Sequence, residues 1–264
     1  DDWFYQIDWQ PEPLAQLTAP SLVAQRIAPH FAEALAQTEI QAYQALLPQL
    51  ENLSLSYVVQ AFMALNGDEP LPLGTAAADL TDKWHISHEQ QRLCQRLWSV
   101  VVEQMGPARQ QNQQQVLLDR HPEAQAELTL IQRCGENLVD VLQGTIDPLT
   151  LLFPTGDLTD LTQLYQASPG ARLMNDLVKR AVRGAIAPVT RAPRILEIGG
   201  GTGGTTAHLL PALINVSRAA DYVFTDISLL FITKAQERFA DYDNIRYQTL
   251  DIEQSPVNQG FEAH

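Results

Sequence analysis

The strongest constraint on the fold is an apolar strand that runs directly into a glycine-rich turn. Residues 194–206 read Arg-Ile-Leu-Glu-Ile-Gly-Gly-Gly-Thr-Gly-Gly-Thr-Thr, with five glycines among six consecutive positions. Glycine tolerates positive φ angles and lets backbone come close to a ligand, and the N–H groups at a helix start attract electron-rich ligand atoms. The stretch therefore predicts a buried parallel strand, a ligand-binding turn and a helix that opens near Thr205.

Two acids follow later predicted strands. The strand predicted for 222–225 leads into Asp226, which is where an acid would accept hydrogen bonds from two ribose hydroxyls. Asp226 also precedes a helix predicted from Ser228, so capping of that helix is the competing interpretation. Asp251 follows the third strand, with Ile252 beside it, and this pair suits an adenine amino group and ring face. Together with the glycines, the two acids predict a nucleoside cofactor.

Glu197, two residues before the first glycine of the turn, helps to distinguish between two classes of cofactor. Gly199, Gly201 and Gly204 formally match the G-x-G-x-x-G pattern of dinucleotide turns. Glu197, however, is a poor neighbour for a pyrophosphate and a good partner for the ammonium or sulfonium end of S-adenosylmethionine. This contrast favours the methyl donor and leaves an NAD-linked dehydrogenase as the weaker alternative.

The composition of the chain limits the classes of partner that the protein can bind. The 264 residues are 45% hydrophobic, enough for a sizeable core in one large or two modest domains. The net charge of −14 argues against a nucleic-acid partner, because such binding needs clustered Lys and Arg. No apolar run reaches the roughly 18 residues of a membrane span, and the Asp-Asp-Trp-Phe start lacks the basic region of a secretory signal. We therefore expect a cytoplasmic protein with no membrane contact.

Cysteines and histidines indicate no metal centre. Cys94 and Cys134 are far apart in helical patterns and are expected to be plain buried thiols. His85 and His88 have a spacing that would place both imidazoles on one helix face, but no third ligand accompanies them. We therefore expect a solvated or capping pair there.

The chain divides into three predicted parts. Residues 1–15 form a junction strand and linker, 16–150 a helical lid domain that includes a long helix over 88–105, and 151–264 the first part of a core. After a helix over 171–187, the core alternates strands (195–198, 222–225, 245–249) with helices (205–213, 228–239). This alternation predicts an α/β fold with a parallel sheet. Three strands make half of a doubly wound sheet, so we expect the core to be truncated, with residues 260–264 leading towards a fourth strand.

These motifs resemble a known family. Residues 195–206, 222–228 and 247–253 are similar to the C-methyltransferase domains of modular polyketide synthases, which belong to the Rossmann-like (class I) S-adenosylmethionine-dependent methyltransferases. Residues 164–175 resemble the segment that folds over the cofactor in these domains. Residues 16–150 resemble the N-terminal lid, and residues 3–11 the junction peptide that opens such a domain.

The resemblance implies C-methylation in polyketide biosynthesis. A methyl group would pass from S-adenosylmethionine, leaving S-adenosylhomocysteine, to the α-carbon of a β-ketoacyl thioester on the phosphopantetheine arm of an acyl carrier protein. The chain would work beside neighbouring synthase domains of a multifunctional enzyme. The residues expected to contact the cofactor are Glu197, Gly199, Gly200, Gly201, Thr202, Gly203, Asp226, Ile227, Asp251, Ile252 and Tyr165.

Several points stay open from the sequence. In the family, the general base is a histidine just after the fourth strand. No residue here matches it, and His264 precedes that strand, so we expect the base outside this chain.

Tyr165 and Asn175 fit a cofactor or substrate contact and an interface role equally well. O-methylation of a similar carrier-bound chain and a non-catalytic structural fragment remain alternatives. The acidic surface predicts weak docking of an acidic carrier protein, aided by tethering.

Overall fold

The computed structural model describes residues 17–104, 121, 124–189, 192–214 and 220–261. Contacts divide the chain into two compact units. The sheet unit comprises Asp1–Ala32, Asp176–Gly201 and Thr205–His264, and the helical unit comprises Glu33–Asn175 and Thr202–Gly204.

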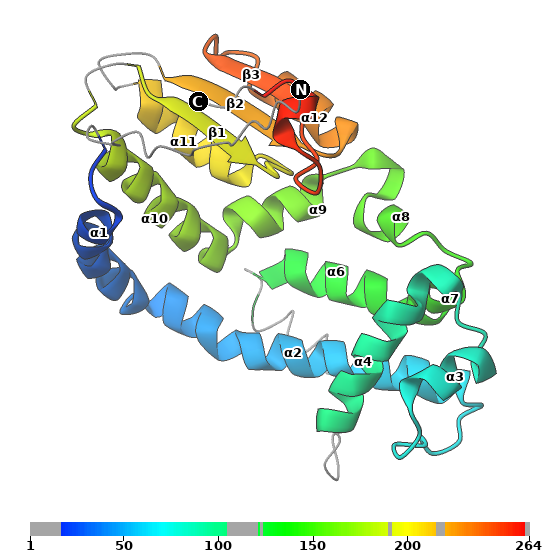
Figure 1. The fold of residues 1–264 in the computed structure, drawn as a ribbon. Coiled ribbons are helices and arrows are strands. Elements are labelled where there is room, and N and C mark those ends of the chain that lie inside the picture. The colour runs from blue at the N-terminus through cyan, green and yellow to red at the C-terminus, as the bar shows by residue number, and fades with distance from the viewer. Residues whose placement is uncertain (1–16, 105–120, 122–123, 190–191, 215–219, 262–264) are drawn as a thin grey trace, which may run out of the picture. The chain divides into compact units, whose positions relative to one another are not determined.

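The helical unit is built along α2 (Thr38–Leu65), which contacts several shorter helices (Figure 1). Its contacts are with α4 (Gln91–Gln104), α6 (Gln125–Glu136) and α7 (Leu138–Gln143). The remaining elements of this unit are α3 (Ala77–Lys83), the 3-10 turns η1 (His88–Gln90) and η3 (Pro154–Gly156), α8 (Pro148–Leu152), α9 (Thr159–Thr162) and the π-helical turn η4 (Gln163–Ala167).

Three aromatic rings form the centre of one core of the helical unit. Phe62 is fully buried, stacks on Trp84 with ring centroids 5.1 Å apart, and meets Trp98 edge-on at 5.4 Å. Such pairs add to the free energy that comes from apolar burial alone. The cluster joins α2, the end of α3 and α4, because each of these elements contributes one ring.

The sheet unit contains a three-stranded parallel sheet in the order β1-β2-β3 (Figure 1). The strands are β1 (Arg194–Ile198), β2 (Asp221–Asp226) and β3 (Ile245–Thr249), and they alternate with α11 (Gly204–Ile214) and α12 (Leu229–Arg238). The unit also holds most of α1 (Pro20–Leu35), the second half of α10 (Pro169–Ile186) and the 3-10 turn η5 (Pro256–Gln259). The predicted α/β order of a helical region followed by a parallel-sheet core is confirmed.

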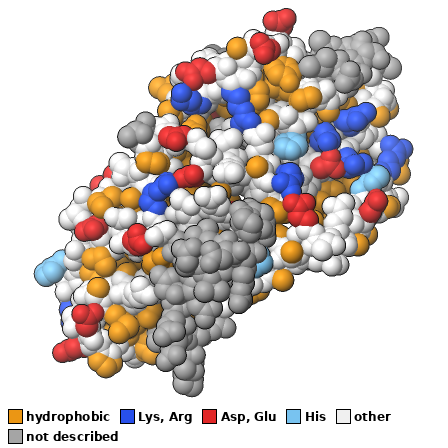
Figure 2. Space-filling view, turned by 180° about the vertical axis from the view of Figure 1, so that it is seen from behind, with side chains coloured by type: hydrophobic (Ala, Val, Ile, Leu, Met, Phe, Trp, Pro, Cys, Tyr) orange, Lys and Arg blue, Asp and Glu red, His pale blue; other side chains and the backbone are white. Residues whose placement is uncertain are grey.

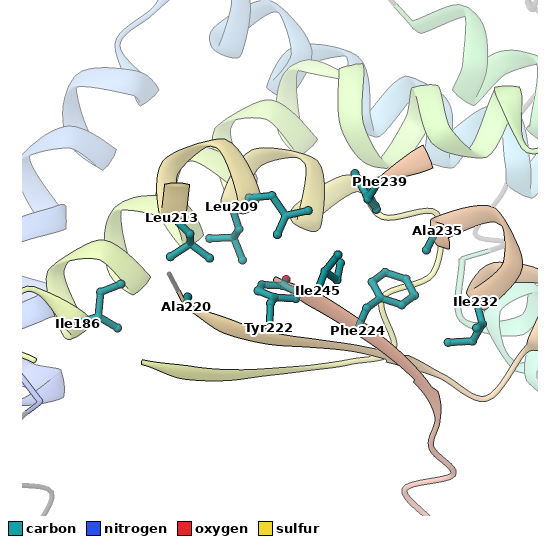
Figure 3. Close-up of a cluster of buried hydrophobic side chains, with 11 residues drawn as sticks. Ile186, Leu209, Leu213, Ala220, Tyr222, Phe224, Ile232, Ala235, Phe239 and Ile245 are labelled. Carbon is teal, nitrogen blue, oxygen red and sulfur yellow. The ribbon is translucent and has the colours of Figure 1, made fainter. Parts of the chain in front are cut away.

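The core of the sheet unit lies on one face of the sheet. Figure 3 shows Leu209 and Leu213 of α11 directed towards Tyr222 and Phe224 of β2, with Ile245 of β3 beside them. Tyr222 and Phe224 are both fully buried. On the opposite face of β1, Leu196 and Ile198 remain 48% and 55% exposed. Alternation along the strands therefore sends one set of side chains under α11 and leaves the other set open.

Some sequence predictions need correction or fall outside the described residues. The helix expected over 88–105 begins instead as the 3-10 turn η1, and α4 starts only at Gln91. His85 has a φ of +54° after the end of α3, so it does not share a helix face with His88. The junction strand at 3–11 and His264 lie outside the described residues.

The unit boundaries also differ from the expected division at residue 150. Residues 151–175 group with the helices, whereas α1 groups with the sheet. The backbone N–H of Thr18 donates to the carbonyl of Ala185 at 3.1 Å, and its hydroxyl donates to the carbonyl of Gly184 at 2.8 Å. These bonds attach the segment just before α1 to the end of α10.

Both thiols lie in helices of the helical unit. Cys94 is fully buried, and burial raises its pKa to about 11. Cys134 is partly buried, which also raises its pKa. A thiol with a raised pKa is mostly protonated and a poor nucleophile at neutral pH, so a packing role fits both. None of the described helices combines the length and apolar character that a membrane crossing needs.

Replacing Phe62 by alanine tests the aromatic core. We expect a loss of about 3–5 kcal/mol in unfolding free energy, because the variant removes a buried ring and leaves a cavity between two tryptophans. Urea unfolding followed by tryptophan fluorescence measures this, with Leu149→Ala as control because Leu149 is 57% exposed. Equal losses in the two variants would contradict the proposed core.

Candidate functional site

The glycine turn after β1 has a backbone that few other residues adopt. Gly199, Gly201 and Gly203 have φ angles of +70°, +54° and +73°. A Cβ on Gly199 would meet no heavy atom within 4 Å, so backbone conformation, rather than crowding, requires glycine there. The space next to the Gly199 Cα is therefore open.

Gly200 is required for a different reason. Its N–H donates to the carbonyl of Thr225 at 2.8 Å, which holds the turn against β2. A Cβ at this position would lie 2.2 Å from the ring of Phe224, far inside van der Waals contact. Close packing against β2 thus selects glycine at the centre of the turn.

Asp226 connects the turn to the next helix. Its Oδ2 accepts a hydrogen bond from the N–H of Gly201 at 2.9 Å, and its Oδ1 accepts one from the N–H of Ser228 at 2.8 Å. The carboxylate therefore does make the local bond at the start of α12 that the capping interpretation expected, and it also fixes the glycine turn. Each carboxylate oxygen has a further lone pair, so these bonds leave acceptor capacity for ligand hydroxyls.

The ends of β2 and β3 are joined beside this site. The N–H of Leu250 donates to the carbonyl of Asp226 at 3.1 Å. The Asp251 carboxylate accepts from the N–H of Glu253 at 2.9 Å and from the side-chain amide of Gln254 at 2.8 Å. Ile227 and Ile252, each directly after one of these acids, are 70% and 68% exposed. The carboxyl-terminal ends of β2 and β3 thus present two carboxylates beside two exposed apolar side chains.

Glu197 points into the core rather than along the strand end. Its Oε2 accepts hydrogen bonds from the Tyr222 hydroxyl at 2.8 Å and from the Thr206 hydroxyl. Burial raises the pKa of the Glu197 carboxyl, and the two hydrogen bonds partly oppose that rise. This carboxylate joins β1, β2 and α11. Its expected contact with a cofactor ammonium or sulfonium group stays a prediction.

Sequence reasoning missed Tyr222 and Thr206 as parts of this arrangement. Tyr222 alternates with Phe224 on the core face of β2, so strand periodicity does place its side chain under α11. Thr206 lies in the first turn of α11 and is fully buried. A buried acid in a strand needs donors nearby, and these two hydroxyls supply them.

Tyr165, Thr202 and Gly203 belong to the helical unit. Tyr165 is 58% exposed in the π-helical turn η4, a form that often marks functional positions. The side-chain amide of the buried Asn175 donates to the Tyr165 carbonyl at 3.0 Å, and a Cβ on Gly204 would lie 2.6 Å from that carbonyl oxygen. Asn175 therefore positions the backbone of this turn, and the ligand contacts expected for Tyr165, Thr202 and Gly203 stay predictions.

The described residues contain no group of three or more His, Cys, Asp or Glu side chains placed to hold a metal ion. The site consists instead of backbone N–H groups, carboxylates and hydroxyls at the carboxyl ends of parallel strands, where open α/β sheets bind ligands.

Comparisons with known proteins identify the family and the fold of the chain. A family model described as "Methyltransferase domain" matches residues 196–263. The non-reducing polyketide synthase prhL of Penicillium brasilianum is 34% identical over 236 residues, which cover 81% of this chain and 9% of that protein. The chain thus spans about a tenth of the length of such curated relatives.

Solved structures extend the match. The CurJ carbon methyltransferase is 39% identical with a TM-score of 0.83, covering 93% of this chain and 69% of that one. The trans-methyltransferase CalH, solved in complex with SAH, is 26% identical with a TM-score of 0.53, covering 86% of this chain and 62% of that one.

The fold and its glycine turn define a methyltransferase domain of the Rossmann-like class. Within that class, the chain belongs to the carbon methyltransferase domains of polyketide synthases, as the sequence motifs predicted.

Replacing Gly200 by alanine tests the close packing of the turn. We expect a loss of about 1–3 kcal/mol in unfolding free energy, because the added methyl group must displace the Phe224 ring or the turn. Thermal unfolding measures this. Gly74→Ala is the control, since a Cβ there meets nothing within 4 Å. A Gly200→Ala variant as stable as this control would show that the turn is not pressed against β2.

Replacing Glu197 by glutamine tests the buried carboxyl. The raised pKa of Glu197 means that the folded state favours the protonated carboxyl. The protonated carboxyl therefore stabilises the fold at low pH, and this stabilisation is lost as pH rises through the folded-state pKa. Because glutamine does not ionise, we expect the stability of Glu197→Gln relative to the unmodified protein to increase as pH rises above about 4.3, the ordinary pKa of a glutamate side chain.

Chemical denaturation at several pH values measures this difference. Glu237→Gln, which removes one exposed surface carboxylate, controls for the change in net charge. Parallel stability curves for Glu197→Gln and the unmodified protein over these pH values would contradict a buried, ionisable Glu197.

Proposed function

We propose that this chain binds S-adenosylmethionine at the carboxyl ends of β1, β2 and β3. The cofactor residues that we assign in the sheet unit are Glu197, Gly199, Gly200, Gly201, Asp226, Ile227, Asp251 and Ile252. Thr202, Gly203 and Tyr165 lie in the helical unit, and the cofactor contacts assigned to them rest on the sequence resemblance alone.

One observation carries this proposal: the Asp226 carboxylate and the positive-φ glycines occupy adjoining positions. The carboxylate lies at a strand end, holds the Gly201 N–H at 2.9 Å, and keeps lone pairs for the two ribose hydroxyls. The space next to the Gly199 Cα is open, which suits close approach by the rest of the cofactor. The exposed Ile227 and Ile252 supply apolar surface for the adenine ring.

The chemistry of these groups fits S-adenosylmethionine better than a dinucleotide. The site holds three carboxylates near its turn and no Lys or Arg among its assigned residues, a poor setting for a pyrophosphate. When bound, the cofactor would supply an electrophilic methyl group on a positively charged sulfur. The complex of the similar CalH with SAH supports this assignment.

We further propose that the methyl acceptor is the α-carbon of a β-ketoacyl thioester on an acyl carrier protein. The acceptor carbon would lose its proton to a base and form a bond to the methyl carbon as the C–S bond breaks, leaving S-adenosylhomocysteine. Membership of the polyketide synthase carbon methyltransferases supports this acceptor. The residues assigned here hold the donor, and none is assigned as the base.

Calorimetric titration with S-adenosylhomocysteine tests the donor site. We expect binding to the unmodified chain and at least about 10-fold weaker binding to Asp226→Asn, because one acceptor oxygen becomes an amide that clashes with a backbone N–H. Asp241→Asn is the matched control, since Asp241 is exposed and we expect unchanged affinity. Absence of both heat and thermal stabilisation in the unmodified chain would favour a non-catalytic structural role.

A second measurement examines the acceptor. The protein is incubated with a β-ketoacyl carrier protein and S-adenosylmethionine labelled with carbon-13 in the methyl group, and the product is analysed by NMR. A methyl resonance typical of carbon attachment supports the proposal, whereas an O-methyl resonance would replace it with the O-methyltransferase alternative.

A further inference from the structure

A cationic hollow lies between α1 and α10 within the sheet unit. It has a volume of about 290 Å³. Its lining consists of Arg26, Ile27, His30, Arg180, Arg183 and Gly184. Lys and Arg side chains gather over these helices on the right-hand side of Figure 2.

This concentration of positive charge is unusual for the chain. The protein has 31 Asp and Glu against 17 Lys and Arg, yet three arginines and a histidine surround one hollow. The carboxylate on this part of α10 is Asp176, which forms ion pairs with Lys179 and Arg180. Arg26 and Arg183 have no ion pair or hydrogen bond with the described residues. Their charges are therefore available to a partner.

Local structure keeps this hollow in shape. The two bonds from Thr18 to the carbonyls of Gly184 and Ala185 attach α1 to the end of α10. Arg26 and His30 are four residues apart on α1, and Arg180 and Arg183 three apart on α10, so each pair shares one helix face. A Cβ on Gly184 would meet only Val23, at 3.8 Å, so packing does not require glycine there. The missing side chain leaves the hollow open between the arginines.

The shape and exposure favour a protein partner. Arg26, His30, Arg180 and Arg183 are all exposed, so the hollow is a shallow surface feature rather than an enclosing pocket. The net charge of −14 repels an extended phosphate backbone, because such a ligand reaches well beyond the hollow. A short acidic segment interacts mainly with the cations that line the hollow. Arginine also pairs with carboxylates through two parallel hydrogen bonds.

We propose that the hollow between α1 and α10 docks a carboxylate-bearing segment of the acyl carrier protein. This inference rests on the proposed function, because that function supplies an acidic carrier protein as the partner. The sequence predicted weak docking between two acidic proteins, aided by tethering. The hollow changes that expectation, because it gives this acidic domain a local cationic surface for the carrier protein. Electrostatic complementarity of this kind mainly raises the association rate and is screened by salt.

Charge reversal tests the docking. An excised acyl carrier domain in its apo form, carrying a fluorescent label, is titrated with the 264-residue chain at about 50 mM salt, and fluorescence polarisation gives Kd. Arg26→Glu and Arg183→Glu are each expected to raise Kd about 10-fold or more. Arg92→Glu, an exposed arginine of α4 in the helical unit, makes the same charge change elsewhere and is expected to change Kd less than about 3-fold.

Other outcomes overturn the inference. It fails if the unmodified chain does not bind the carrier, if the variants of the hollow bind as tightly as the unmodified chain, or if Arg92→Glu weakens binding equally. It also fails if only the phosphopantetheinylated carrier binds and free phosphopantetheine competes, since the arginines would then hold a phosphate. Loss of duplex RNA binding in the variants of the hollow, with carrier binding intact, would assign the hollow to nucleic acid.

Calorimetry with S-adenosylhomocysteine separates this inference from the proposed function. Arg26→Glu and Arg183→Glu lie outside the residues assigned to the cofactor and are expected to bind it as the unmodified chain does. Failure of carrier docking with cofactor binding intact therefore rejects only the docking site, whereas failure of cofactor binding in every variant and in the unmodified chain rejects the donor site.

Discussion

The carboxylate of Asp226 holds together the parts of the sheet unit on which the site depends. One oxygen fixes the Gly201 N–H of the turn after β1, and the other holds the Ser228 N–H where α12 begins. Two backbone segments that are far apart in sequence therefore share one buried anion at the end of β2. Capping and ligand binding are not exclusive roles for this residue, since the carboxylate has acceptor sites left after both bonds. The glycine turn keeps its positive φ angles in part because this anion holds it against β2.

A second acid, Glu197, holds the strand that leads into this turn to its neighbours. Glu197 accepts bonds from Thr206 and Tyr222, so β1, β2 and α11 meet at one carboxyl group. Leaving such a group without donors would cost more than the bonds themselves contribute, which makes the two hydroxyls necessary companions. Its charge also favours a cationic ligand over a pyrophosphate in the neighbouring turn. The acid that separates the two cofactor classes in the sequence thus has a structural role in the fold.

Charge is distributed unevenly between the two proposed binding regions of the sheet unit. The donor site presents carboxylates and backbone N–H groups, as suits a cofactor with a positively charged sulfur. The hollow between α1 and α10 presents arginines in a chain that is otherwise strongly acidic. A domain that takes a cationic cofactor and an acidic partner needs separate surfaces of opposite sign, and these two regions offer them.

The local sequence was enough to predict the α/β order, the glycine turn and the acids after the strands, because strand and turn patterns depend on neighbouring residues. It also carried the family resemblance. It did not predict that Asp226 holds Gly201, that Glu197 faces Thr206 and Tyr222, or that Asn175 supports a π-helical turn at Tyr165. Nor did it predict that α1 joins the sheet unit, where Arg26 and Arg183 come together from positions more than 150 residues apart. Such partnerships join distant segments, so they depend on how strands and helices pack and not on the pattern within any one of them.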